Sequence, residues 1–292
     1  MQLIDLYKSL FAILRIDTSM LQNNAKIVGT GFVINTNPIY ILTCNHVVSE
    51  GTEDNDSKII YAIIKRSDTV KKFDLRNVQI SYLKAKKICY KPEYDIAILE
   101  IDPLLNIKIA QKLGIPNNIK ALKMDFQEKT RLIGSPVEWV SAGTLGDLTI
   151  TPRFFKGNIV TKYIVDQRYK FTNFRGAEQS QIMEGINLLE VDQLFLPGCS
   201  GSPVFSTKKQ EVIGYVHGFK SWPIITDNVI NYEAEISENS IIRKANVKSK
   251  AALIASLSLA IDIKNVKTFL SENKFVTRQK FGFIKYFKKF KK

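Results

Sequence analysis

The sequence predicts an all-β protein, built as a sandwich or a barrel, with one helix near its C-terminal end. Short runs rich in β-branched and aromatic residues follow one another along most of the chain, and Gly, Pro, Asn, Asp or Ser residues separate them. No repeat of fixed length is present. Runs with this spacing are typical of antiparallel sheets, whereas a parallel α/β fold would alternate strands with helical segments.

The predicted strands begin with "LFAILRID" at residues 10–17 and end with "EVIGYVHG" at residues 211–218. Between them lie the runs 26–35, 39–48, 58–66, 77–85, 94–101, 131–136, 157–165, 186–192 and 202–206. Each run is short and is bounded by turn residues, which is the pattern expected of strands joined by tight connections.

Two helices are expected. A short amphipathic segment lies near residues 2–9. The second helix covers residues 262–273, where Asp262 is a suitable N-cap. Its apolar residues form one stripe at helical spacing, namely Ile263, Val266, Phe269 and Leu270.

Composition places the chain among globular proteins. Its 292 residues are 45% hydrophobic, enough for one large domain or two small ones. No apolar run reaches about 18 residues, and Asp5 and Lys8 interrupt the apolar start, so we expect neither a transmembrane segment nor a signal peptide. Three cysteines without a paired spacing favour a reducing compartment over a disulfide framework. We therefore expect a cytoplasmic protein.

The positive charge is concentrated at the C-terminal end. The formal net charge is +14, and residues 278–292 supply seven cations and no acid, which is half of it. Residues 275–292 contain six aromatic residues, five of which are interleaved with these cations. Such a basic aromatic tail, residues 275–292, can bind an anionic membrane surface, which would make the protein membrane-peripheral, or nucleic acid. It can equally be a solvated extension, or pack its aromatic side chains back on the main domain.

The stretch "FLPGCSGSPVF" at residues 195–205 places Ser200 between two glycines. A serine hydroxyl becomes a nucleophile beside a base that a carboxylate orients. Of the two histidines, His46 is the candidate base, at the end of an apolar run. Asp95 opens an apolar run in which an unpaired carboxylate would be costly to bury, so it is the candidate carboxylate. The alternative is that Ser200 is a turn residue, His46 a strand-end histidine and Asp95 a strand cap.

At these residues the chain resembles a trypsin-like serine peptidase of the chymotrypsin fold, and most closely the HtrA/Deg-type protease domain. The motifs of that family occur here as "GTGFVIN", "YILTCNHVV", "DIAILEI" and "DQLFLPGCSGSPVF". They place His46, Asp95 and Ser200 in the order His, Asp, Ser, at spacings of 49 and 105 residues. The resemblance covers about residues 10–272.

The resemblance implies a double six-stranded β-barrel with a C-terminal helix. The protease domain would occupy residues 1–274, with barrels at about 10–110 and 125–260, and the tail at 275–292 would follow it. No PDZ domain is expected after it. The sequence does not indicate an oligomeric state.

The activity that the resemblance implies is serine endopeptidase activity on polypeptide substrates through an acyl-enzyme, with no metal and no cofactor. His46 would act as base and then acid, Asp95 would orient the imidazole, and Ser200 would attack the scissile carbonyl. Two alternatives are a catalytically silent trypsin-like binding module and an adaptor that its tail localises to a membrane or nucleic acid. The complete set of catalytic residue types argues against the first, and the mildly basic main domain argues against the second.

The loop around Ser200 also contains the expected oxyanion hole. The backbone N–H groups of Gly198 and Ser200 can turn toward one point, with the Cys199 amide nearby. Two positions depart from the family motif, because Ser202 replaces a glycine and Cys199 replaces the common Asn or Asp. Both are interpreted as neighbours of the site, outside its catalytic atoms.

The expected substrate pocket is built on Leu194, His217 and Gly218. In relatives that cleave after basic residues, an acid lies six residues before the nucleophile, where this chain has Leu194, and Asp192 lies eight before. In the family, the strand that carries His217 forms the pocket wall. His217 therefore either contacts a P1 side chain or turns toward the barrel and Asp95, because a one-residue change of register reverses the face.

We predict that the protein does not prefer Lys or Arg at P1 and accepts a medium-sized apolar P1 residue, because no acid stands at position 194 to pair with a cation. A peptide library in which only P1 varies measures this preference. Strong cleavage after Arg would contradict it.

Overall fold

The computed structural model describes residues 6, 8–17, 24–48, 58–66, 79–101, 104, 106–113, 117, 119–142, 153–172, 178–193, 198–238 and 241–273. Three expectations fall outside these ranges: most of the helix near residues 2–9, the pocket residue Leu194 and the basic tail at 275–292.

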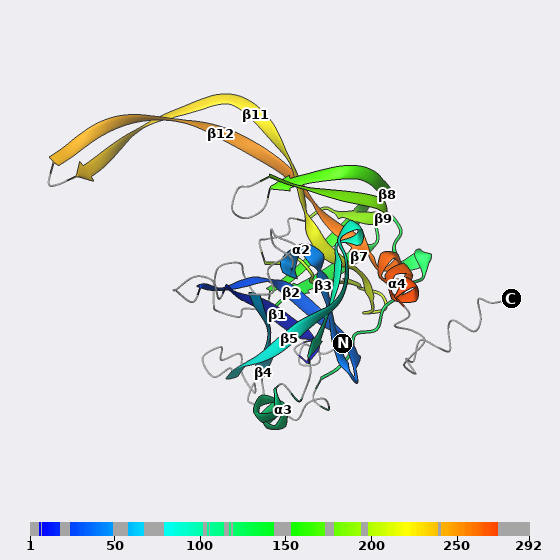
Figure 1. The fold of residues 1–292 in the computed structure, drawn as a ribbon. Helices are drawn as coiled ribbons and strands as arrows, with labels where there is room; N and C mark the ends of the chain where they lie inside the picture. The colour runs from blue at the N-terminus through cyan, green and yellow to red at the C-terminus, as the bar shows by residue number, and fades with distance from the viewer. Residues whose placement is uncertain are drawn as a thin grey trace.

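Six strands close the first barrel in the order β1-β2-β3-β6-β5-β4 (Figure 1). They are β1 (Leu10–Asp17), β2 (Asn24–Thr36), β3 (Ile39–Cys44), β4 (Lys58–Arg66), β5 (Gln79–Lys91) and β6 (Ile96–Ile101). All neighbours are antiparallel, and β1 closes the barrel by pairing with both β2 and β4.

The second barrel has the order β10-β11-β12-β9-β8-β7. Its strands are β7 (Pro136–Ser141), β8 (Arg153–Thr172), β9 (Glu178–Val191), β10 (Pro203–Ser206), β11 (Val212–Glu238) and β12 (Ile241–Asp262). The helical elements are α2 (Asn45–Val48), η2 (Pro92–Tyr94), α3 (Ile107–Leu113), η3 (Glu128–Thr130) and α4 (Ile263–Glu272). The expected double six-stranded barrel with a C-terminal helix is confirmed.

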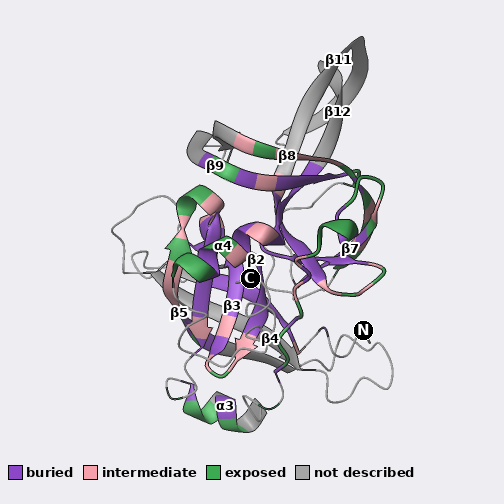
Figure 2. Cartoon of the chain, turned by 90° about the vertical axis from the view of Figure 1, so that its right-hand side faces the viewer, coloured by how far each residue is buried: buried purple, intermediate pink, exposed green. Residues whose placement is uncertain are grey.

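One apolar core runs through the first barrel and continues into the second barrel and α4. It includes Phe11 and Phe32 from the first barrel, Tyr215 from the second and Phe269 from α4, all fully buried. A separate cluster around Trp139 fills the rest of the second barrel, and Figure 2 shows buried residues along strands of both barrels. Because the core is shared, packing holds the two barrels in a fixed relation at the level of the candidate site.

The structure differs from the predicted strands in several places, and no predicted run covers most of β7 or any of β12. Residues 131–135 form a turn in which Leu132 and Ile133 are exposed and Gly134 has a φ of 80°, and β7 begins at Pro136. The run at 39–48 divides into β3 and the helical turn α2. Strands β11 and β12 continue beyond the barrel as a long hairpin, which Figure 1 shows in yellow and orange. Among the described helices, none is long and apolar enough to cross a membrane.

Helix α4 has the predicted cap and stripe. The Asp262 carboxylate accepts a hydrogen bond of 2.8 Å from the Lys264 backbone N–H, as an N-cap residue does. The predicted stripe, Ile263, Val266, Phe269 and Leu270, is buried.

Arg131 joins the segment between the barrels to the start of α4. Its Nε lies 3.0 Å from Asp262 Oδ2, and both side chains are almost completely buried. The guanidinium also donates to the carbonyls of Asp125 (2.7 Å) and Phe126 (3.1 Å). Burial raises the pKa of Asp262 above its ordinary value, although the charge of Arg131 opposes this.

Replacing Arg131 with alanine is expected to lower the free energy of unfolding by about 3–5 kcal/mol, because Asp262 would stay buried without its counter-charge. Lys156→Ala is the matched control. It breaks a 3.0 Å ion pair with Glu138, but Lys156 is 81% exposed, so the expected loss is about 1 kcal/mol or less. Urea unfolding measures both variants, and equal losses would contradict a structural role for the buried pair.

Candidate active site

His46 is the second residue of α2, the helical turn that follows β3. The chain reverses here because the Asn45 N–H donates to the Asp95 carbonyl (3.0 Å) and the His46 N–H donates to Asp95 Oδ1 (2.9 Å). Val47 and Val48 are buried and anchor the turn. The His46 side chain is 26% exposed, so it is partly open to solvent.

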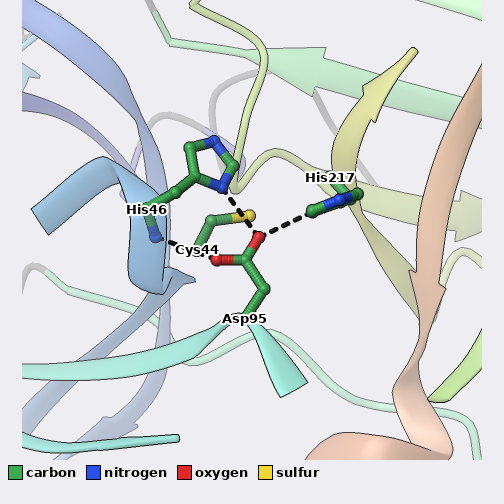
Figure 3. Close-up of side chains that lie close together, drawn as sticks. All are labelled: Cys44, His46, Asp95 and His217. Carbon is green, nitrogen blue, oxygen red and sulfur yellow. Dashed lines mark hydrogen bonds and ion pairs between the residues drawn. The ribbon is translucent and has the colours of Figure 1, made fainter. Parts of the chain in front are cut away.

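Asp95 lies at the end of η2, just before β6, and its backbone is left-handed with a φ of 48°. Its N–H donates to the Pro92 carbonyl (2.9 Å), which fixes the turn. The side chain is fully buried, and Oδ2 lies 2.8 Å from His46 Nδ1 (Figure 3). The structure therefore brings the predicted base and the predicted carboxylate together.

His217 contacts the same carboxylate oxygen. Its Nδ1 lies 2.6 Å from Asp95 Oδ2, and its side chain is only 6% exposed. The His46 and His217 rings meet edge to face, with centroids 5.6 Å apart (Figure 3). The structure thus shows His217 turned toward Asp95, the second of the two orientations that the sequence left open, and not toward a P1 side chain.

A β-bulge explains this orientation. The register between β11 and β12 shifts between Val216 and Gly218, so His217 is the extra residue in its strand. Val216 and His217 are both buried, although neighbours in a regular strand point to opposite faces. A bulge is not visible in the hydrophobic pattern of the run, so sequence reasoning could not choose between the two faces.

The charges of this group can be assigned from its hydrogen bonds. Burial alone would raise the pKa of Asp95, but the nearby histidines and their hydrogen bonds outweigh it and hold that pKa well below its usual range. Burial would lower the pKa of His46, but the charge and hydrogen bond of Asp95 outweigh it and raise that pKa above 6.5. An ionised carboxylate has no proton to donate, so both Nδ1 atoms carry the hydrogen. In the neutral ring of His46, Nε2 is then the basic nitrogen.

Ser200 lies in a loop that both barrels anchor. The Thr30 N–H donates to the Ser200 carbonyl, and the Gly201 N–H donates to the Val216 carbonyl, both at 2.8 Å. The half-buried Ser200 hydroxyl donates to the carbonyl of His217 at 3.3 Å. The predicted nucleophile is thus placed directly beside the residue whose ring binds Asp95.

Hydrogen bonds to its carbonyl groups fix the backbone of the loop around Ser200. The Gly198 carbonyl accepts from the hydroxyls of Thr30 (3.2 Å) and Ser141 (3.3 Å), and the Cys199 carbonyl accepts from the Ser202 N–H (2.9 Å). These bonds orient the peptide planes that carry the Cys199 and Ser200 amides, both expected at the oxyanion hole. The Gly198 amide shares its plane with a residue outside the described ranges. Gly198 itself has a φ of 92°.

The predicted pocket is only partly described. Gly218 is half-buried, and a Cβ built on it would meet no heavy atom within 4 Å, so its α-carbon faces open space. Asp192 is exposed and accepts hydrogen bonds from the backbone N–H (2.7 Å) and Nδ2 (3.0 Å) of Asn158. The Asp192 carboxylate is therefore hydrogen-bonded to Asn158 of β8.

Cys44 is a neighbour that sequence reasoning missed. It is fully buried, and its thiol lies 3.1 Å from the Val216 carbonyl. Burial and the nearby Asp95 charge raise the pKa of this thiol well above its ordinary value, so it stays protonated. The signal was its place in "LTCNH", two residues before the base, where β3 ends and the turn that carries His46 begins.

The donor atoms of Cys44, His46, Asp95 and His217 all lie within 4.8 Å of one another. Such donors would suit zinc, but zinc takes thiolate and unprotonated imidazole nitrogen. Ligand atoms that bind one zinc ion at about 2.0–2.3 Å stand more than about 3 Å apart, whereas the two Nδ1 atoms lie 2.8 and 2.6 Å from Asp95 Oδ2, at hydrogen-bond distance. The arrangement is therefore a hydrogen-bonded group centred on the carboxylate.

Comparison with known proteins agrees with this geometry. A family model described as a trypsin-like peptidase domain matches residues 29–214, a range that contains His46, Asp95 and Ser200. No curated protein matches the chain.

Three of the solved structures that are similar to the chain have the following identity and coverage. The Rv3671c protease from M. tuberculosis in its active form is 16% identical, with a TM-score of 0.49, covering 91% of this chain and 80% of that one. Deg5 is 13% identical, with a TM-score of 0.48, covering 73% of this chain and 81% of that one. The MamO protease domain from Magnetospirillum magneticum is 12% identical, with a TM-score of 0.45, covering 90% of this chain and 96% of that one.

Replacing Gly201 with alanine is expected to destabilise the protein by about 2 kcal/mol or more, because the new Cβ would stand 2.0 Å from the Thr30 carbonyl oxygen. Gly134→Ala is the matched control: Gly134 has a similar φ, 80° against 84°, but nothing lies within 4 Å of its Cβ position. We expect it to cost about 1 kcal/mol. Thermal unfolding of both variants separates the steric contact from the backbone strain, and equal losses would show that the Thr30 contact is unimportant.

Proposed function

This chain belongs to the trypsin-like peptidase family, and on that premise we propose that it is a serine endopeptidase in which Ser200, His46 and Asp95 form the catalytic triad. The observation that supports this most is the hydrogen bond between His46 Nδ1 and the buried Asp95 carboxylate. It leaves Nε2 as the base, and the Ser200 loop is anchored on the neighbouring strand β11.

The proposed reaction begins with a movement of one hydroxyl. In the resting structure the Ser200 hydroxyl donates to the His217 carbonyl, so it must turn toward His46 Nε2 before it attacks. Nε2 then takes the serine proton while Oγ bonds to the scissile carbonyl carbon, and the amides near Gly198 and Ser200 stabilise the oxyanion. The imidazolium gives its proton to the leaving amine, and water hydrolyses the acyl-enzyme by the same steps. Asp95 stabilises the imidazolium and keeps its own charge throughout.

The compartment and the partners belong to this proposal too. Three free cysteines, Cys44, Cys89 and Cys199, support a reducing compartment such as the cytoplasm. The alternation of cations and aromatic side chains in residues 275–292 supports binding to an anionic membrane surface.

Neutralising the tail with Lys288→Gln, Lys289→Gln, Lys291→Gln and Lys292→Gln tests the membrane proposal. We expect co-sedimentation of the full-length chain with phosphatidylserine vesicles to fall steeply, because each cation near such a surface contributes about 1 kcal/mol. Unchanged sedimentation would rule out the membrane role. Binding of wild type to single-stranded nucleic acid instead would favour the nucleic-acid alternative.

Covalent labelling with a fluorophosphonate probe tests the triad directly, because the probe reacts only with an activated serine. We expect wild type to be labelled and Ser200→Ala and His46→Ala to lose labelling, His46→Ala by on the order of 10⁴-fold in rate. Wild type is tested with and without a chelator, so that a zinc ion on the histidines would be detected as labelling that appears only after chelation. Absence of labelling in folded wild type under both conditions would instead support a catalytically silent binding module.

A further inference from the structure

The proposed mechanism gives no role to the buried histidine His217. His217 is the second of only two histidines in the chain, and its Nδ1 lies closer to Asp95 Oδ2 (2.6 Å) than His46 Nδ1 does (2.8 Å). The same residue accepts the Ser200 hydroxyl on its carbonyl. It therefore contacts both the carboxylate and the nucleophile of the proposed triad.

The ionisable groups around His217 come from several elements. Asp95 precedes β6, His46 lies on α2, and Cys44 ends β3. Tyr215, on the same strand, places its hydroxyl 3.1 Å from the Tyr94 carbonyl and has a raised pKa, chiefly through burial. The Cys44 thiol and the Tyr215 phenol are neutral. Among these groups, the Asp95 carboxylate is therefore the negative charge that faces the His217 ring.

We propose that His217 is a positioning residue for the triad, which donates its Nδ1–H to Asp95 Oδ2 and thereby holds the carboxylate in the orientation that keeps His46 protonated on Nδ1. The proposal rests on the function proposed above for Ser200 and His46. A carboxylate oxygen accepts two hydrogen bonds, so both imidazoles can be satisfied on Oδ2 while Oδ1 accepts the His46 backbone N–H.

The chemical consequence concerns the basicity of His46. A carboxylate that has lost one donor interacts more strongly with the remaining one, which raises the pKa of His46 and shifts the loss of activity at low pH to higher pH. The carboxylate and the His46 ring would also be less firmly oriented, which slows reaction at every pH. A side chain at position 217 that donates a hydrogen bond to Asp95 Oδ2 is sufficient to prevent both effects.

Two substitutions separate the donor from the packing. In His217→Leu the bulk of the ring is largely kept and the donor is lost. In His217→Asn the amide nitrogen can stand where Nδ1 stands and can donate to Oδ2. We measure the rate of fluorophosphonate labelling across pH for wild type and both variants.

We expect His217→Leu to react about 10- to 100-fold more slowly, as for loss of a hydrogen bond to a buried charge. In the plot of labelling rate against pH, the fall in rate at low pH should begin at a higher pH for this variant than for wild type. His217→Asn should restore the wild-type position of that fall and most of the rate. A wild-type pH dependence and rate in the folded Leu variant would overturn the proposal, as would an Asn variant that behaves like Leu.

A second measurement does not depend on catalysis. Because the chain has two histidines, ¹⁵N-histidine labelling gives the NMR signals of two imidazole rings, each with an Nδ1 and an Nε2, and the His217 variants assign them. We expect both rings of wild type to carry a proton on Nδ1 that is shifted far downfield. A His217 ring protonated only on Nε2 would overturn the positioning role even if the Leu variant failed to fold. If wild type does not label but both Nδ1 protons are present, the proposed function fails and the hydrogen-bonding arrangement stands.

Discussion

The buried carboxylate of Asp95 is the constraint on which the rest of the site depends. An ionised carboxylate in a dry interior is stable only when hydrogen-bond donors surround it. Here His46, on the turn after β3 of the first barrel, supplies its backbone N–H and its Nδ1. His217, in the bulge of β11 of the second barrel, supplies its Nδ1. The charge is therefore satisfied only when the two barrels are docked, and docking at the same time places the Ser200 loop of the second barrel against Thr30 of the first. The need of the buried Asp95 carboxylate for donors from both barrels thus favours the arrangement of the barrels that assembles the candidate site.

Several neutral hydrogen bonds reinforce this coupling across the same interface. The Cys44 thiol of the first barrel bonds to the Val216 carbonyl of the second, and the Tyr215 hydroxyl of the second bonds to the Tyr94 carbonyl of the first. Thr30 holds the Ser200 loop through both its backbone and its hydroxyl. Because these groups are buried, an error in docking would leave several of them unsatisfied, which makes a single relative placement of the barrels favourable.

Local signals predicted an all-β protein with a C-terminal helix, and the resemblance to trypsin-like peptidases supplied the double barrel and the pairing of His46 with Asp95. Strand β1 has the predicted limits, since its apolar run ends at turn residues on both sides, and α4 has the predicted cap at Asp262. Other features depend on long-range geometry and left no local signal. The orientation of His217 depends on a bulge relative to β12, and the turn at residues 131–135 depends on Arg131 reaching its buried partner Asp262. The long β11–β12 hairpin did leave a local signal, because residues 230–237, "INYEAEIS", alternate apolar and polar side chains as a strand does, and no predicted strand included them.

Asp95 organises the site only if it remains ionised wherever the protein is folded, and NMR titration of ¹³C-labelled aspartate side chains, with Asp95→Asn to assign the signal, measures this most directly. We predict that the chemical shift of the Asp95 carboxyl keeps its ionised value well below pH 3.8, the ordinary aspartate pKa, while exposed aspartates titrate. A midpoint at or above that value would mean that the two imidazoles do not stabilise the ionised carboxylate, and that Asp95 does not organise the site as described.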